Sequence, residues 1–351
     1  MKTYKTYILT ACLLLIAFTL FAGTDWNVTK NMFRYQKDVD ESMSADDTRN
    51  MATICYRDTL FNFVNFQGAG DFSKVVVRKI FHTGTQPDFG WNYQKFDGIP
   101  TLGHLEGKDW QPAPVVFHDS LILFYTAYHT PSFPNGNTRY AVYDPLNNSW
   151  WSDGIVPGNN NNGITSHGMA AVVVEDKLCL VTHDLSNNIE IHWTKDLKTW
   201  HHFSTSTNIN NSNGEYDAIS AVSAPFWDQN SKRRSKLVFA CRDGNKHPYA
   251  FEYYFSDDLT LTQLRTTAIT TDDAYSSVAL AVGTIGPDAT STGDCIQAFL
   301  KRDAQDNSHI YHRILRYQLK NNIWTRIEEN VLPQNSPKHM WASREIPLTV
   351  A

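Results

Sequence analysis

Apolar segments of one kind recur along this chain, each followed by a short polar turn and a second apolar segment. The two clearest copies occupy residues 113–124 and 169–180, and a third runs from Ser223 to Ala240 through a charged insert. Short apolar runs bounded by turn residues are typical of β-strands. The pattern therefore predicts strands joined by tight turns.

These copies follow one another at a nearly constant interval. The apolar residue after each turn stands at positions 60, 121, 178, 237 and 296, so the steps are 57 to 61 residues long. Each unit continues through an Asn/Gly/Pro-rich loop to an aromatic alternating strand, and then through a turn to a tryptophan. A repeat of this length, built only from strands, is a signature of radial β-architecture.

The second half of the unit is clearest in three places, where alternating segments at 138–143, 189–193 and 310–317 lead to Trp150, Trp200 and Trp324. We expect these tryptophans to be buried anchors at the start of outer strands. The prediction is an all-β fold, a five-bladed β-propeller with four-stranded antiparallel blades, formed as one domain by residues 51–351. A stacked β-solenoid is the alternative, but its repeats are usually shorter and its aromatic side chains less bulky.

Composition agrees with a large β-domain, because 42% of the 351 residues are apolar and no long amphipathic helical run is present. The formal net charge of −5 and the pI near 6.2 argue against a nucleic-acid partner, since binding to phosphate requires a basic surface. The one basic run, Lys232-Arg233-Arg234, is interpreted as a solvated turn.

The first residues have the features of an export signal. Lys2 and Lys5 precede an apolar stretch over residues 7–22, and polar residues begin at Thr24. We therefore expect a signal peptide at 1–23, with an uncleaved anchor as the alternative, and a lead-in segment at 24–50. The protein would be secreted or at the cell surface (periplasmic in a bacterium) and would touch a membrane only through an uncleaved N-terminal segment. Acceptor sequons begin at Asn27, Asn147 and Asn210, so a host that glycosylates would make it a glycoprotein.

After cleavage the chain would keep four cysteines, at positions 55, 179, 241 and 295. An even number in an oxidising compartment permits two disulfides without specifying them, and buried free thiols are the alternative. No Cys-x-x-Cys spacing occurs. The pair His201-His202 follows Trp200 at a strand end and is interpreted as packing residues, so neither a metal nor a cofactor is expected.

Two turns resemble a known family motif. Residues 194–200, Thr-Lys-Asp-Leu-Lys-Thr-Trp, are similar to a shortened sialidase Asp-box, and 256–260 is a partial copy without the tryptophan. The Asp-Leu-x-x-Trp form is also similar to turns of five-bladed glycoside hydrolases such as arabinanases and invertases. The layout of the units resembles propeller lectins of the fucose-binding kind. The resemblance spans about residues 50–340 and lies in scaffold positions, so it implies a fold rather than an activity.

Candidate catalytic residues follow from the expected fold. In propellers the residues just before each innermost strand line the central funnel, and here those positions supply Asp47, Asp109 and Asp217. Glycosidases need an acid and a second carboxylate at one sugar bond, which such a ring can supply. Aspartates before strands also cap turns, which is the structural alternative.

The other possibility is that the protein binds a sugar without catalysing a reaction. Sugars present apolar C–H faces rimmed by hydroxyls, so their sites combine an exposed aromatic ring with polar groups. Five tryptophans stand in expected loops or at strand edges: Trp91, Trp110, Trp151, Trp227 and Trp341. The candidate ligand-binding residues are Trp110, His167, Glu215, Tyr216, Asp273, Arg242 and Asp243. The last two recur as Arg302-Asp303 and as His183-Asp184, which also fits a repeated turn device.

The function that we expect is therefore lectin-like binding of an extracellular or surface glycan or glycoconjugate. The alternatives are a five-bladed glycoside hydrolase that uses the funnel carboxylates and a propeller that binds proteins.

Overall fold

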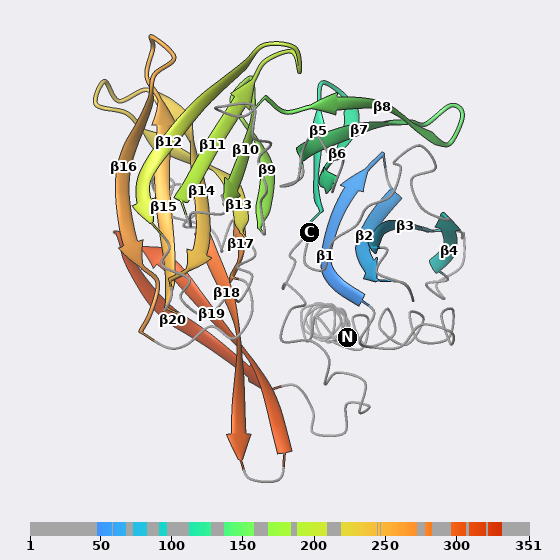
Figure 1. Cartoon of the computed structure of the whole chain (residues 1–351). Helices are drawn as coiled ribbons and strands as arrows, with labels where there is room; N and C mark the ends of the chain where they lie inside the picture. The colour runs from blue at the N-terminus through green and yellow to red at the C-terminus, as the bar shows by residue number, and fades with distance from the viewer. Residues whose placement is uncertain are drawn as a thin grey trace, which may run out of the picture. The chain divides into compact units, whose positions relative to one another are not determined.

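The computed structural model describes residues 48–57, 59–67, 73–82, 91–96, 112–127, 137–157, 168–183, 188–208, 219–243, 245, 247–271, 278–282, 296–306, 309–320 and 322–331. All of them belong to one compact unit, residues 45–351. They form strands, bends and turns, without any helix (Figure 1).

These residues build five antiparallel sheets of four strands, each in chain order. The first sheet contains β1 (Thr48–Tyr56), β2 (Thr59–Gln67), β3 (Ser73–His82) and β4 (Trp91–Phe96). The second contains β5 (Ala113–Phe117), β6 (Ser120–Ala127), β7 (Asn137–Asp144) and β8 (Ser149–Ile155). The third contains β9 (Met169–Val174), β10 (Lys177–His183), β11 (Asn188–Thr194) and β12 (Trp200–Asn208). The fourth contains β13 (Ser220–Trp227), β14 (Arg233–Arg242), β15 (Pro248–Phe255) and β16 (Leu261–Ala268). The fifth contains β17 (Val278–Val282), β18 (Ile296–Asp306), β19 (His309–Lys320) and β20 (Ile323–Val331).

Each sheet corresponds to one copy of the sequence repeat. The marker positions 60, 121, 178, 237 and 296 all fall in the second strand of a sheet, near its start or middle. The expected all-β fold with four-stranded antiparallel sheets is confirmed. The closure of these sheets into one five-membered ring stays a prediction.

The second strand of a sheet is buried on both faces. In β6, Leu121 and Leu123 pack in the apolar cluster shared with the first sheet, whereas Ile122 and Phe124 pack in the cluster shared with the third. All four side chains are fully buried. Successive side chains of a strand point to opposite faces, so a strand between two cores must be apolar at every position. This is why β6 is an unbroken apolar run from Leu121 to Phe124.

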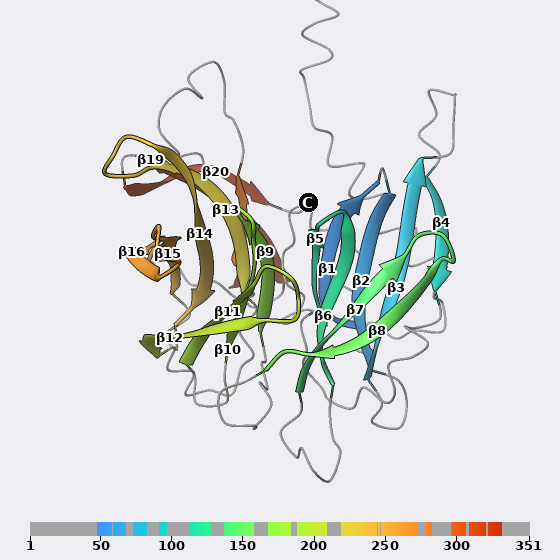
Figure 2. The same cartoon turned by 90° about the horizontal axis from the view of Figure 1, so that it is seen from above.

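The described residues form four apolar clusters, and each joins two sheets that are consecutive in the chain. The first strands of consecutive sheets also adjoin, β1 with β5, β5 with β9, β9 with β13, and β13 with β17. Figure 2 shows β9 beside β13. Each sheet packs face to face on the next one, and their first strands adjoin. This is the arrangement of blades in a propeller.

The tryptophans that follow the outer turns differ in burial. Trp150 and Trp324 are 3% and 9% exposed, as expected for buried anchors. Trp200 is only half-buried, and its Nε1 donates to the Leu197 carbonyl of its own turn at 3.2 Å. The prediction of a buried anchor is therefore confirmed for two of the three residues and is wrong for Trp200.

The described cysteines do not form the two disulfides that four cysteines would permit. Cys55 is an exposed free thiol and Cys179 is a buried one. Two disulfides would need all four cysteines, so that alternative is wrong. Burial raises the pKa of the Cys179 thiol, which keeps it protonated inside the cluster between the third and fourth sheets.

The N-terminal segments 1–23 and 24–47, with the sequon at Asn27, lie outside the described residues, as does the sequon at Asn210. Within the part that is described, no helix has the length and apolarity needed to cross a membrane. Asn147 is exposed in the turn between β7 and β8, where its side chain donates to Asp144 Oδ2 at 2.7 Å.

Gly154 on β8 tests how tightly the second and third sheets are joined. A Cβ at this position would lie 1.9 Å from Cζ of Tyr140, whose hydroxyl donates to the Leu197 carbonyl of the third sheet at 3.3 Å. Gly154→Ala should displace the tyrosine and cost about 1–3 kcal/mol of unfolding free energy. Thermal unfolding beside Ile155→Ala, an exposed neighbour, measures this; equal melting temperatures for the glycine variant and the wild type would contradict it.

Candidate functional site

Each sheet has two ends, which differ in the connections that they carry. In a four-stranded antiparallel sheet, the turns between strands 1 and 2 and between strands 3 and 4 lie at one end, called here the turn end. Loops between strands 2 and 3, and the connections between sheets, lie at the other, the loop end. Most of the predicted site residues lie outside the described residues: Asp47, Asp109, Asp217, Trp110, His167, Glu215, Tyr216 and Asp273. Their grouping around a funnel stays a prediction.

Arg242 and Asp243 are the two described candidates at the loop end. Arg242 is the last residue of β14 and is 5% exposed. Asp243 Oδ1 accepts from the backbone N–H groups of Asn245 and His247 at 2.9 and 2.8 Å, and its own N–H donates to the His247 carbonyl. The aspartate therefore holds the turn between β14 and β15, in the manner of an Asx turn.

The similar pairs in other sheets are not equivalent to this one. Asp303 lies within the long ladder of β18 and β19, opposite His312, and so does not end a strand. His183 is the last residue of β10, and Asp184 lies outside the described residues. The expected equivalence of Arg302-Asp303 to Arg242-Asp243 is wrong, because the fifth sheet has a longer hairpin at this point.

The Asp-box-like turn between β11 and β12 is a structural cap. Asp196 Oδ1 accepts from the N–H groups of Lys198 and Thr199 at 2.9 and 2.7 Å. These hydrogen bonds, with that from Thr199 the strongest, lower the pKa of the Asp196 carboxyl. Leu197 takes a positive φ of 62°, which fixes the turn, and Trp200 packs edge-to-face on Phe124 of the second sheet. This arrangement serves packing between sheets.

Two of the five tryptophans expected in loops or at edges are exposed where the structure describes them. Trp151 is 56% exposed and Trp227 is 52% exposed. Both lie at the turn end, Trp151 near the start of β8 and Trp227 as the last residue of β13. The side chains of Trp91, Trp110 and Trp341 lie outside the described residues. An exposed indole offers an apolar face and one N–H donor to a ligand.

An open hollow of about 440 Å³ lies along β13 and β14, the strand pair in which Trp227 faces Arg233. The hollow is lined by Glu175, Ser223, Pro225, Arg233, Arg234 and Ser235. Directly paired residues of β13 and β14 share one face of the sheet, and the pairs here are Trp227 with Arg233 and Pro225 with Ser235. The indole, the exposed Arg233 and the two hydroxyl-bearing serines therefore gather on one face. We call this group, with Glu175, the Trp227 hollow.

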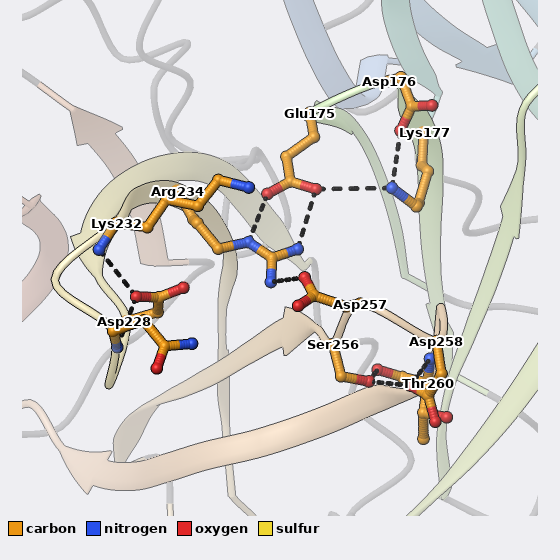
Figure 3. A network of polar contacts seen from close by, with 11 residues as sticks. Glu175, Asp176, Lys177, Asp228, Lys232, Arg234, Ser256, Asp257, Asp258 and Thr260 are labelled. Atoms are coloured by element: carbon orange, nitrogen blue, oxygen red, sulfur yellow. Dashed lines mark hydrogen bonds and ion pairs between the residues drawn. The ribbon is translucent and has the colours of Figure 1, made fainter.

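Ion pairs build the wall of the hollow (Figure 3). Arg234 Nε donates to Glu175 Oε1 at 3.1 Å, and Arg234 Nη1 donates to Asp257 Oδ1 at 3.0 Å. These contacts join the third sheet to β14 and to the turn between β15 and β16. Lys177, 3% exposed, lies 3.5 Å from Glu175 Oε2. Partial burial would raise the pKa of Glu175, but its contacts with Arg234 and Lys177 hold it below the ordinary value. The wall therefore carries an ionised carboxylate.

Arg233 differs from Arg234. It makes no ion pair with any residue that the structure describes, and its side chain is exposed. A guanidinium presents five N–H donors in a planar fork, which suits hydroxyl, carboxylate and phosphate groups. The interpretation of Lys232-Arg233-Arg234 as a solvated turn is right for Lys232 only. Arg233 is exposed but begins β14, and Arg234, the next residue of that strand, is 11% exposed and bridges two sheets. The basic run in the sequence indicates that arginines lie here. Only the structure shows that Arg233 is the exposed one.

Comparison with known proteins supports the scaffold. No protein-family model matches the chain, and no curated protein matches it. Among solved structures, a mutant of AofleA from Arthrobotrys oligospora is 11% identical, with 81% of this chain and 74% of that chain covered and a TM-score of 0.54. The wild-type AofleA structure gives 10% identity, the same coverage and a TM-score of 0.52.

The six-bladed β-propeller lectin of Aleuria aurantia, described with a fucose recognition mode, is 13% identical over 83% of this chain and 80% of that chain, with a TM-score of 0.48. Similarity at these levels concerns the fold alone. The resemblance to β-propellers at the level of the scaffold is confirmed.

Proposed function

We propose that this protein is a carbohydrate-binding propeller, and that the Trp227 hollow is one of its sugar sites. The observation that carries the proposal is the pairing of the exposed Trp227 with Arg233, which lines the hollow together with the carboxylate of Glu175 and makes no ion pair with a described residue. A pyranose presents an apolar face that can stack on the indole, while its hydroxyls accept from Arg233 and donate to Glu175. The propeller fold agrees with this function without specifying it.

Glycan recognition outside the cell is part of the same proposal. It rests on the basic and apolar pattern of residues 1–23, which fits an export signal. Mass spectrometry of protein recovered from culture medium would show whether the mature chain begins near residue 24. A chain that stays inside the cell with Met1 intact would contradict export but would leave the sugar site to be tested separately.

The binding test compares two exposed tryptophans. A glycan array first identifies the sugar class, and titration calorimetry then measures affinity for that sugar. Trp227→Ala should weaken binding at least about tenfold, equal to about 1.4 kcal/mol, because the stacking face is lost. Arg233→Gln should weaken it as well.

Trp151→Ala is the matched control, since Trp151 is similarly exposed but belongs to β8 of the second sheet and not to the β13–β14 pair along the hollow. Both tryptophan variants should keep the wild-type unfolding free energy within about 0.5 kcal/mol, as expected of exposed positions. Full affinity in Trp227→Ala would place the sugar site elsewhere, and an empty array would contradict carbohydrate binding itself.

A further inference from the structure

Two histidines and a glutamate meet on the outer strands of the third sheet. Glu190 and His192 stand two residues apart on β11, and His202 on β12 is paired directly with His192. Residues at i and i+2 share a face of a strand, and so do direct cross-strand partners. All three side chains therefore lie on one face of the sheet, and their potential ligand atoms lie within 4.8 Å of one another.

Two of the three distances between these groups are long for hydrogen bonds and match the spacing of neighbouring zinc ligands. His192 Nε2 lies 3.4 Å from Glu190 Oε2, and His202 Nε2 lies 3.3 Å from Glu190 Oε1. Nitrogen to oxygen hydrogen bonds are usually about 2.7–3.2 Å long. Two atoms bound at about 2.1 Å to a tetrahedral zinc ion lie about 3.4 Å apart, since the tetrahedral angle fixes that edge.

The burial of His192 is a second, independent observation. Its side chain is 0% exposed, and neither ring nitrogen has a hydrogen-bond partner among the described residues. A buried polar group is normally satisfied, so an imidazole left in this state needs an explanation. The Oγ1 atom of Thr182, which is paired with Glu190 across β10 and β11, is likewise buried without a partner.

The three side chains have the chemistry of a metal site. Imidazole nitrogens and carboxylate oxygens are common zinc ligands in proteins. Two imidazoles and one carboxylate are a ligand set that zinc accepts, with a fourth position left for water.

We propose that Glu190, His192 and His202 bind one divalent transition-metal ion, with zinc as the best fit. Glu190 and His202 keep 16% and 17% of their side chains exposed, which leaves the site an approach from solvent. Bound metal would join β11 to β12 and satisfy the buried imidazole. From the sequence, His201-His202 is interpreted as a pair of packing residues. His192 stands ten residues before His202, and only the strand register shows that the two are paired.

The test uses the full chain, stripped of metal with a chelator and titrated with zinc against a chromophoric competitor. The wild type should bind one zinc ion per chain and melt at a higher temperature with zinc than without it. His202→Ala should lose at least about 100-fold in affinity, because one of three protein ligands is removed. His201→Ala is the matched control: this adjacent histidine is exposed and stacks on Trp193, and its loss should leave zinc affinity unchanged.

Glu190→Gln provides a second variant if His202→Ala fails to fold, and should show a similar loss. The cobalt(II) form of the wild type needs no variant, and its visible absorption should report a four- or five-coordinate nitrogen and oxygen site. Equal zinc affinity in His202→Ala, Glu190→Gln and His201→Ala would overturn the proposal, as would a wild type that takes up no zinc or gives only the spectrum of aqueous cobalt.

Discussion

Replacing Trp150 by alanine should destabilise the fold by about 3–5 kcal/mol, the range seen when a large aromatic side chain is removed from a core. Trp150 is 3% exposed and packs edge-to-face on Phe63 of the first sheet, with ring centroids 5.7 Å apart. It also packs on Tyr143 of its own sheet, with ring centroids 5.2 Å apart. The substitution would therefore open a cavity in the cluster that joins two sheets, where neither sheet can easily move to fill it.

The next residue supplies the control. Trp151 is the same residue type on the same strand but is 56% exposed, so Trp151→Ala should cost less than about 0.5 kcal/mol. Trp150→Phe should cost less than the alanine variant, because it keeps a ring and removes an indole N–H that has no partner among the described residues. Urea unfolding followed by circular dichroism measures all three. Equal midpoints for the two alanine variants would contradict the assigned burial.

The strand order could be predicted from sequence because β-strands in this chain carry local signals. Several second strands contain unbroken apolar runs, such as 121–124 and 237–240, and three of the described turns after a third strand contain an aspartate that accepts from nearby backbone N–H groups. Asp144, for example, accepts from the N–H of Leu146 at 2.9 Å. Such turns depend on a few adjacent residues, so their spacing along the chain gives the repeat directly.

Burial of the tryptophans was harder to predict, because it depends on the neighbouring sheet. Trp150 and Trp200 follow similar turns, yet only Trp150 is enclosed. Trp200 stays half-buried, with its N–H bound to its own turn and one face on Phe124. Sequence spacing gives the position of a residue along its strand, but the depth of packing depends on the shape of the neighbouring sheet.

Both proposed sites depend on contacts between residues that are distant in the chain or lie on paired strands. Arg234 meets Glu175 from 59 residues away, and His202 meets His192 only through the register of β11 and β12. The funnel carboxylates were predicted from the general layout of propellers, and they lie outside the described residues. The sequence therefore indicated the scaffold and the exposed tryptophans, whereas the polar partners required the structure.

A buried cluster of charged side chains in the fourth sheet is the second place where a substitution should strongly lower the unfolding free energy. Lys236 Nζ lies 2.6 Å from Glu252 Oε2, and Arg265 binds the same carboxylate through Nε and Nη2, the latter at 3.0 Å. The side chains of Lys236 and Glu252 are 4% and 1% exposed. Transferring such charges from water is costly, and the cost is offset only while the opposite charges remain paired.

Glu252→Gln should therefore cost about 3–5 kcal/mol, because it leaves the ammonium of Lys236 buried without its anion while changing the side-chain volume little. Urea unfolding measures the loss. Asp257→Asn is the matched control: it also breaks an ion pair with an arginine, but Asp257 is 87% exposed, so the expected cost is about 0–1 kcal/mol.

The double variant Lys236→Met with Glu252→Leu separates the cost of an unpaired charge from the value of the pair. It removes both buried charges, and Arg265, 23% exposed, can then turn its guanidinium to solvent. Apolar replacement of a buried pair is often neutral or stabilising, so the double variant should be more stable than Glu252→Gln alone. If the single variant cost less than about 1 kcal/mol, or if the double variant were the less stable of the two, Lys236 would not depend on Glu252 for its burial, and water or another anion would have to reach it.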